Sequence, residues 1–404
     1  MKRSLFILAL LPIATGRALA QAAPTENALK YLQQASKILK LDGYKPALPL
    51  AEARRLVQAN AGVFPLLTHA IELPLRFDRD NFARMQLPIF SSVRNAARLL
   101  SLRAQVQAGD GDFDGAVNSN LQAVALGEKM QEDGALISAL VGYAVEAVGS
   151  SALQRLAPQL DAPRLKSAAR GLSALEQKRP PFATILKSER EVSQQIMREQ
   201  FAQEKPPFDA ATQKRLLEAT REVSQRDDAL LSRPFALTRG LDFRGPQAAP
   251  EGGQNADAFA EDKLPRVGPN FDAHAWAQAG QKTLRPLKFS VLVARTRSQA
   301  RLALLEADLA ARAYWRQNNA PPASLQVLVP DFLPALPADP FALNAPLRFK
   351  RAGDTVRFYS VGPDGLDDGG KEIEKVQGVL IIGADSLGDI VQDTAKPEPM
   401  QPVA

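Results

Sequence analysis

Residues 336–341 read Leu-Pro-Ala-Asp-Pro-Phe, and residues 358–365 read Phe-Tyr-Ser-Val-Gly-Pro-Asp-Gly. A residue that precedes proline is pushed out of the helical region, so the first stretch is fixed as an extended turn. Between the two, apolar and polar residues alternate over 347–349 and 356–358, which is typical of half-buried strands. Ala352-Gly353-Asp354 supplies a turn to join them. This segment predicts a small antiparallel sheet.

A long helix is predicted before this sheet, from about residue 286 to residue 318. Apolar or small residues recur there in steps of three or four: Val291, Ala294, Ser298, Leu302, Leu305, Leu309 and Ala313. The helix ends in Tyr314-Trp315 and a polar run. A helix laid against a small antiparallel sheet buries one face of each.

Five short motifs follow one another in this region. They are an aromatic helix end at 313–318, Pro-Ala-Ser-Leu at 322–325, the turn at 336–341, the loop at 358–365 and Asp389-Ile390. Their order resembles the soluble head of the major pseudopilin of type II secretion. The resemblance implies a pseudopilin-like fold, with a long helix packed on a small antiparallel β-sheet.

The loop after the last predicted strand is strongly acidic. Residues 359–393 carry eight Asp or Glu residues against two lysines, which leaves a local net charge of −6. Crowded carboxylates repel one another, and a hard divalent cation would relieve that repulsion. In the pseudopilin family the corresponding loop binds calcium. The resemblance implies Asp364, Asp368 and Asp389 as ligands for Ca²⁺, with Asp367 next. An acidic, solvated loop without metal is the alternative.

The loop does not match two other motifs that its residues partly resemble. An EF-hand pattern would start at Asp364, but Leu366 occupies its third place and Lys375 its twelfth, where a bidentate Glu belongs. A phosphate-binding loop would need Ser or Thr where Glu372 stands. The chain also departs from the pseudopilin pattern between Gly370 and Asp389, where the apolar run at 379–382 predicts an additional strand.

The N-terminal residues 1–20 have the features of a secretory signal peptide. Lys2 and Arg3 precede an apolar run, and Ala18-Leu19-Ala20 supplies a small-x-small cleavage site. We therefore expect an exported protein, periplasmic or extracellular, without a stable membrane span after cleavage. An uncleaved N-terminal anchor is the alternative. Removal of Lys2, Arg3 and Arg17 lowers the formal net charge from +6 to about +3, so basicity gives no indication of nucleic-acid binding.

Residues 21–239 predict an α-helical domain. A Gly-Asp-Gly-Asp turn at 109–112 separates two amphipathic helices, and this hairpin is similar to one tetratricopeptide repeat. A generic helical hairpin is the alternative. The run 135–156 is apolar nearly all round except for Glu146, which favours a buried helix over a membrane span.

Proline and paired glycines mark 240–270 as a linker or flap. Residues 271–393 then form the long helix and the pseudopilin-like sheet, and 394–404 form a disordered tail. The sequence therefore predicts an α+β protein, with a large, mostly α-helical N-terminal domain and a small antiparallel β-sheet at the C-terminus.

No catalytic motif is recognisable. The chain has no cysteine, which excludes disulfides and thiolate sites, and its two histidines, His69 and His274, are far apart in sequence. It also lacks the leader and apolar helix with which pseudopilins begin, so we do not expect it to polymerise through a membrane-helix spine.

Three hypotheses follow. The first is an exported, non-enzymatic structural or protein-interaction protein whose helical part binds a protein partner. The second is an accessory component of a type II secretion or pilus-like system that contacts pseudopilins. The third is a hydrolase with a site in the helical domain, which a cleft gathering His69 or His274 with carboxylates would favour.

Overall fold

The computed structural model describes residues 26–42, 44–45, 48–77, 82–203, 208–239, 241, 271–375 and 380–397. The predicted signal peptide, nearly all of the predicted linker and residues 398–404 lie outside these ranges.

The protein is an α+β protein, as the sequence predicts. The helices are α1 (Ala28–Ile38), α2 (Leu50–Ala59), α3 (Val63–Glu72), α4 (Phe82–Gly109), α5 (Phe113–Lys129), α6 (Leu136–Leu156), α7 (Ala162–Glu176), α8 (Phe182–Gln203), α9 (Ala210–Leu231), α10 (Phe235–Thr238) and α11 (Ala273–Asn318), with single turns η1 (Ala157–Gln159) and η4 (Gln326–Leu328). The strands are β1 (Ala338–Asp339), β2 (Ala345–Pro346), β3 (Arg348–Ala352), β4 (Thr355–Ser360) and β5 (Ile390–Ala395).

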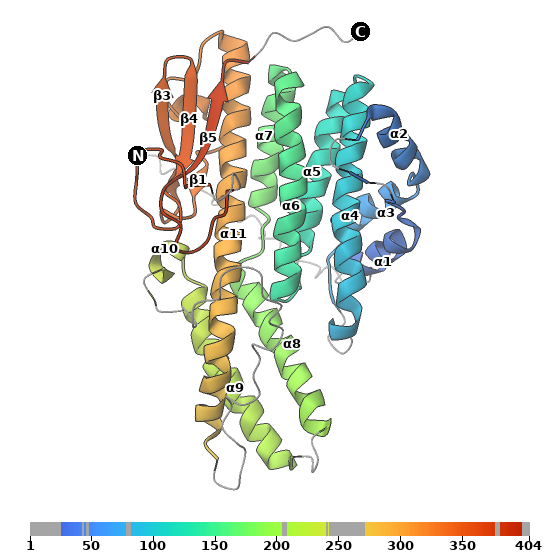
Figure 1. Cartoon of the computed structure of the whole chain (residues 1–404), viewed down its shortest axis with the longest axis vertical. Coiled ribbons are helices and arrows are strands. Elements are labelled where there is room, and N and C mark those ends of the chain that lie inside the picture. Colours follow the sequence, from blue (N-terminus) through green and yellow to red (C-terminus); the bar gives the residue numbers. More distant parts are fainter. Residues whose placement is uncertain are drawn as a thin grey trace, which may run out of the picture.

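The long helix α11 runs the length of the molecule and organises the rest (Figure 1). Its C-terminal half carries the sheet on one side and packs against α6 and α7 on the other. Beyond these lie α5 and α4, and then the short helices α1 to α3. The N-terminal half of α11 packs on α9, which in turn packs on α8.

The main sheet has the antiparallel order β3-β4-β5. Phe349 pairs with Phe358 across the first two strands, and Tyr359 pairs with Val391 across the second two. The hairpin turns at Gly353, whose φ of +59° is accessible to glycine at little cost. These two strands and their turn confirm the prediction from the alternating residues.

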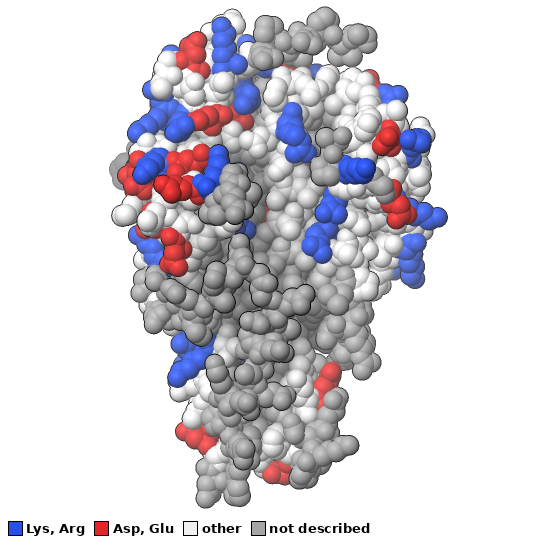
Figure 2. All heavy atoms as spheres, viewed as in Figure 1, with Lys and Arg blue, Asp and Glu red and all other residues white. Residues whose placement is uncertain are grey.

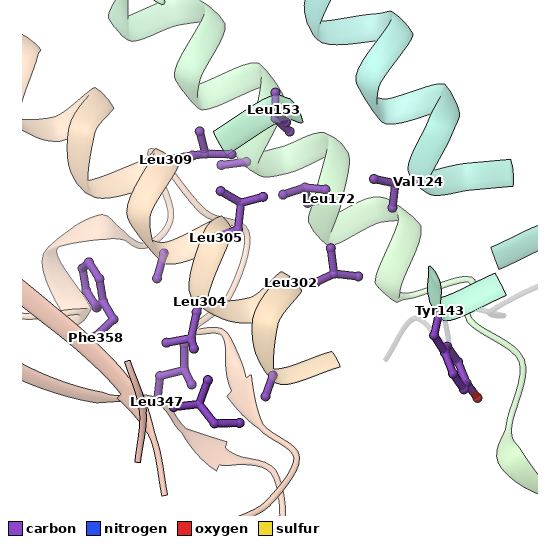
Figure 3. Close-up of a cluster of buried hydrophobic side chains, with 14 of the residues drawn as sticks. Val124, Tyr143, Leu153, Leu172, Leu302, Leu304, Leu305, Leu309, Leu347 and Phe358 are labelled. Atoms are coloured by element: carbon purple, nitrogen blue, oxygen red, sulfur yellow. The ribbon is translucent and has the colours of Figure 1, made fainter. Parts of the chain in front are cut away.

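The hydrophobic core is continuous from the bundle through α11 to the sheet. Figure 3 shows both faces of α11 in use: Leu304 lies on the side of Leu347 and Phe358, whereas Leu305 points toward Leu172 of α7. The sheet and the helical bundle therefore share one core.

The predicted start of α11 is wrong by more than three turns. The helix begins at Ala273, because the Asp272 side chain accepts hydrogen bonds from the backbone N–H groups of His274 and Ala275. Pro286, which the sequence analysis took as the helix start, lies inside the helix. A proline there removes one helical hydrogen bond, and packing of this half of α11 on α9 offsets the loss.

Two details of the C-terminal segment also differ from expectation. Residues 380–382 form no strand; Ile382 is buried, and its carbonyl accepts a hydrogen bond from Arg297. Strand β5 continues to Ala395, past the expected boundary at 393, because Thr394 is buried and donates to Asp308 on α11.

One helical stretch among the described residues, Leu136–Gln159, is long and apolar enough to cross a membrane by length and composition alone. Sixty-one per cent of its most apolar window is buried within the protein. It packs on α4, α5 and α11, as the prediction of a buried helix requires.

Helices α5 and α6 approach closely where Gly127 faces Gly142. A Cβ atom added at Gly142 would lie 2.5 Å from the Gly127 carbonyl oxygen, and one added at Gly127 would lie 2.6 Å from the Gly142 carbonyl oxygen. The two glycines thus let the backbones of α5 and α6 touch.

We expect Gly142→Ala to destabilise the protein by about 1–2 kcal/mol, because overpacking outweighs the gain in helix propensity. Urea unfolding followed by circular dichroism measures this. Gly62→Ala is the matched control, since its Cβ would meet only Ile38 at 3.6 Å. If Gly142→Ala were as stable as Gly62→Ala, close backbone contact would not be what holds α5 on α6.

Candidate functional site

A buried aspartate ties the turn at 336–341 to the end of β4. Asp339 is fully buried. Its Oδ1 accepts hydrogen bonds from Phe341 N at 3.0 Å and from Ser360 Oγ at 2.7 Å, and its Oδ2 accepts one from Val361 N at 2.9 Å. Burial raises the pKa of Asp339, and these donors act against that rise. The sequence predicts the turn but not this role of Asp339, for which the nearby hydroxyl of Ser360 is the one signal.

Asp364, the first predicted ligand, is used to shape the loop. Its Oδ1 accepts a hydrogen bond from Leu366 N at 3.0 Å, and its Oδ2 accepts one from Gly388 N at 2.9 Å. The second bond joins the loop to the residue just before Asp389.

Asp367 and Asp368 are exposed. The Asp367 carboxylate accepts hydrogen bonds from Gly369 N at 3.0 Å and from Arg348 Nε at 3.2 Å. Burial, together with the Asp367 carboxylate, raises the pKa of Tyr359 to about 12. Asp367 is therefore held in place by β3 and β4.

Asp389 is the buried centre of the predicted set, with none of its surface exposed. Its Oδ2 accepts a hydrogen bond from Gly370 N at 2.6 Å. Its Oδ1 is buried with no hydrogen-bond partner. Burial raises the pKa of Asp389 to about 6; the backbone N–H groups of Gly370 and Asp368 lower it, and the charges of Asp367 and Asp368 raise it further.

The fold thus brings Asp389 against the loop that carries Asp367 and Asp368, with Asp364 bonded to the neighbouring residue. Within the ranges that the structure describes, no three His, Asp or Glu side chains lie close enough to share a metal ion. A bound cation would need Asp389 Oδ1, one loop carboxylate and backbone carbonyls.

Basic side chains from β3 and β4 balance much of the acidic loop, which sequence reasoning missed. Lys350 donates to the Gly369 carbonyl, and Arg357 donates to the Gly370 carbonyl at 2.8 Å. Arg357 also pairs with Asp393 at 2.6 Å. Figure 2 shows the result, with acidic and basic groups intermixed over the sheet. Because a strand pairing creates these contacts, the local charge of −6 overstated the repulsion.

A second group of ionisable residues lies inside the bundle, around Arg179. This side chain is 1% exposed. Three carboxylates surround it: Glu176 at 2.7 Å, Glu146 at 2.8 Å and Glu128 at 3.7 Å. Gln131 donates to Glu146 as well. The sequence signal for this cluster was the single Glu146 within an otherwise apolar helix.

One cation cannot neutralise three carboxylates, of which Glu146 and Glu128 are buried with it and Glu176 is partly exposed. Burial raises the pKa of Glu128 to about 8; the charge of Arg179 lowers it, and the charges of Glu146 and Glu176 raise it. Glu128 is therefore the carboxyl of this cluster that takes up a proton near neutral pH.

The two histidines lie on the surface, far from this cluster. His69 Nε2 is 3.3 Å from Glu26 Oε2, and His274 Nε2 is 3.1 Å from Glu222 Oε2. His274 lies in an open depression of about 290 Å³ with Glu218 and Glu222. This depression gathers a histidine with carboxylates, as the hydrolase hypothesis requires. Its described lining holds no hydroxyl side chain to serve as a nucleophile, and His274 is about half exposed.

Comparisons of this chain with protein families, with curated proteins and with solved structures found no match. The pseudopilin resemblance therefore remains a prediction from the motifs, and function has to be inferred from the geometry of the described residues.

Glu128 predicts a definite pH dependence of stability. Its pKa in the folded protein, about 8, exceeds the ordinary value of 4.5, so the folded state binds the proton more tightly. The contribution of this bound proton to the free energy of unfolding is fully present below pH 4.5 and is lost as the pH rises through about 8. Between those pH values we expect the wild type to lose on the order of 1–4 kcal/mol of its free energy of unfolding. Glu128→Gln should not show this loss.

Urea unfolding between pH 5 and pH 9 measures this effect. Glu199→Gln, which changes an exposed carboxyl on α8, is the control and should follow the wild-type profile. A Glu128→Gln profile parallel to wild type would contradict the assignment of the proton to Glu128.

Proposed function

We propose that this chain is an exported, non-enzymatic structural or protein-interaction protein whose pseudopilin-like C-terminal domain binds calcium. The observation that carries the proposal is the buried Asp389 carboxylate, whose Oδ1 lacks a partner beside an acidic loop. A buried polar atom without a partner costs about 1–3 kcal/mol, and more when it carries charge. A cation is one way to recover that cost.

The donor set favours a hard cation. The Asp389 carboxylate, whose pKa burial raises, lies near enough to Asp367 and Asp368 for their charges to raise that pKa further, and calcium accepts carboxylate oxygens in an irregular shell. Asp389 Oδ1 would be the central ligand, Asp368 the second carboxylate, and loop carbonyls would complete the shell. A bound ion would supply a fixed positive charge that cross-links the loop to the start of β5.

The protein-interaction part of the proposal is supported by the helical region. In its ionisable cluster Arg179, Glu146 and Glu128 are buried and only Glu176 reaches solvent, and its two histidines pair with single glutamates at the surface. We therefore assign the helical surface to binding a protein partner.

Calcium binding has a direct test on the full chain. Millimolar CaCl₂ should raise the melting temperature over EDTA by several degrees, because a ligand of the folded state alone stabilises it by RT ln(1 + [L]/Kd). Asp389→Asn should abolish this shift. Asp385→Asn, which changes an exposed carboxylate of the same segment, should keep the shift in melting temperature. Identical wild-type melting curves in calcium and in EDTA would refute the metal site.

Export has a separate test, independent of the metal. The predicted cleavage site places Gln21 at the mature N-terminus. Mass spectrometry of protein recovered from the periplasm or medium should find it there. Recovery of chains that still begin at Met1 would contradict the cleaved signal peptide.

A further inference from the structure

A groove of about 460 Å³ is lined by residues of α6, α11 and the start of β5. This volume is within the range of small-molecule sites, roughly 300–1,000 Å³. At one end Gln154 of α6 donates to Gln392 of β5 at 2.8 Å, and elsewhere Arg297 donates to the Ile382 carbonyl at 3.0 Å.

The groove exists because α6 presents small side chains to it. Ala144, Ala147, Ser150 and Ser151 recur along one face of α6, and none is long enough to fill the space below β5. Ala144 and Ala147 are exposed, so the groove is open to solvent along this face.

Two arginines on α11, Arg297 and Arg301, line the opposite wall. They are one helical turn apart, where like charges repel. Arg297 is half-buried and Arg301 is exposed at the rim of the groove. Partial loss of solvent around them lowers the pKa of both, and the charge of Arg297 lowers that of Arg301 further. Among the described residues, neither forms an ion pair with a carboxylate, whereas Arg164, Arg179 and Arg312 all do.

No Asp or Glu lines the groove, and two buried carboxylates that lie on or against α11 bind other residues. Glu146 pairs with Arg179 and accepts a hydrogen bond from Ser298, which itself lines the groove. Asp308, two turns beyond Arg301, is fully buried and binds Arg312 and Thr394. In the described part of the chain, the positive charge of the groove therefore has no carboxylate partner.

The rest of the lining is apolar. Leu140, Leu302, Leu305, Leu380 and Ile390 contribute side chains to it. A ligand that matches both the two arginines and the apolar lining must combine an anionic group with an apolar body.

We propose that this groove binds a small amphiphilic organic anion, with its carboxylate or phosphate on Arg297 and Arg301 and its apolar body along the leucines. The planar guanidinium fork matches either oxyanion in a two-point contact. The occupant would touch bundle, long helix and sheet together, and so would stabilise their junction. This inference is independent of the calcium site.

Isothermal titration calorimetry of the full chain with decanoate and decyl phosphate, each below its critical micelle concentration, tests this proposal. We expect saturable one-to-one binding of at least one. Their relative affinities distinguish a carboxylate ligand from a phosphate ligand. Inorganic phosphate tests the charge alone, and decyltrimethylammonium tests the same apolar body with the opposite charge; both should bind at least about tenfold more weakly.

Two variants locate the site. Arg301→Gln should weaken binding about tenfold, as loss of a charge-assisted pair predicts. Ala147→Trp should block it by filling the groove. Both positions are exposed, so folding should survive, and circular dichroism checks this. Lys282→Gln removes one exposed charge from the same helix outside the groove and should leave affinity unchanged.

The proposal is overturned by any of three results. These are no binding of either anion by the folded wild type, equal affinity for the cationic analogue or for inorganic phosphate, and undiminished binding by Arg301→Gln and Ala147→Trp.

Discussion

Along 291–313, α11 packs its apolar side chains into the bundle on one side and into the sheet on the other. A sheet of three short strands is barely stable alone and needs a partner layer. The helix supplies that layer, and the same helix completes the core of α6 and α7. Burying both faces also forces polar groups inside. Asp308 is fully buried on α11, and its bonds to Arg312 and Thr394 fix the register of β5 on the helix.

The burial of both faces of α11 also explains two unusual charge arrangements, the cluster around Arg179 and the pair Arg297 and Arg301 in the groove. Where α11 passes α6, Ser298 reaches inward to Glu146 and so joins the long helix to the Arg179 cluster. Arg297, next to Ser298, and Arg301, about one turn further along α11, line the groove and pair with no carboxylate among the described residues. Acid is therefore in excess inside the bundle, and base is in excess in the groove. Protonation of Glu128 removes excess negative charge inside the bundle. An arginine cannot lose its proton at physiological pH, so the groove keeps its positive charge.

Local patterns predicted those elements whose side-chain periodicity can be read from the sequence. Alternation of side chains predicted β3 and β4, and the apolar run predicted α6 as a core helix. Features set by tertiary contacts escaped prediction. Pro286 looked like a helix start because the sequence does not reveal that α9 supports the preceding turns. The fold brings Asp389 against the loop that carries Asp367 and Asp368, yet among the described residues no three acidic side chains come together. The hydrogen bond of Asp389 to Gly370 and the contact of Lys350 from β3 depend on strand pairing, which the sequence does not reveal.

These cations alter the reason for a metal in the loop. Lys350 and Arg357 already take the carbonyls of Gly369 and Gly370, so charge balance alone does not require calcium. What neither can reach is Asp389 Oδ1, which stays buried without a partner. Protonation is the other remedy, because the pKa of Asp389 rises to about 6. Above that pH the carboxylate ionises and the cost of leaving it unpaired grows. A metal would therefore gain its advantage from one buried oxygen, which makes Asp389 the ligand on which the calcium proposal depends.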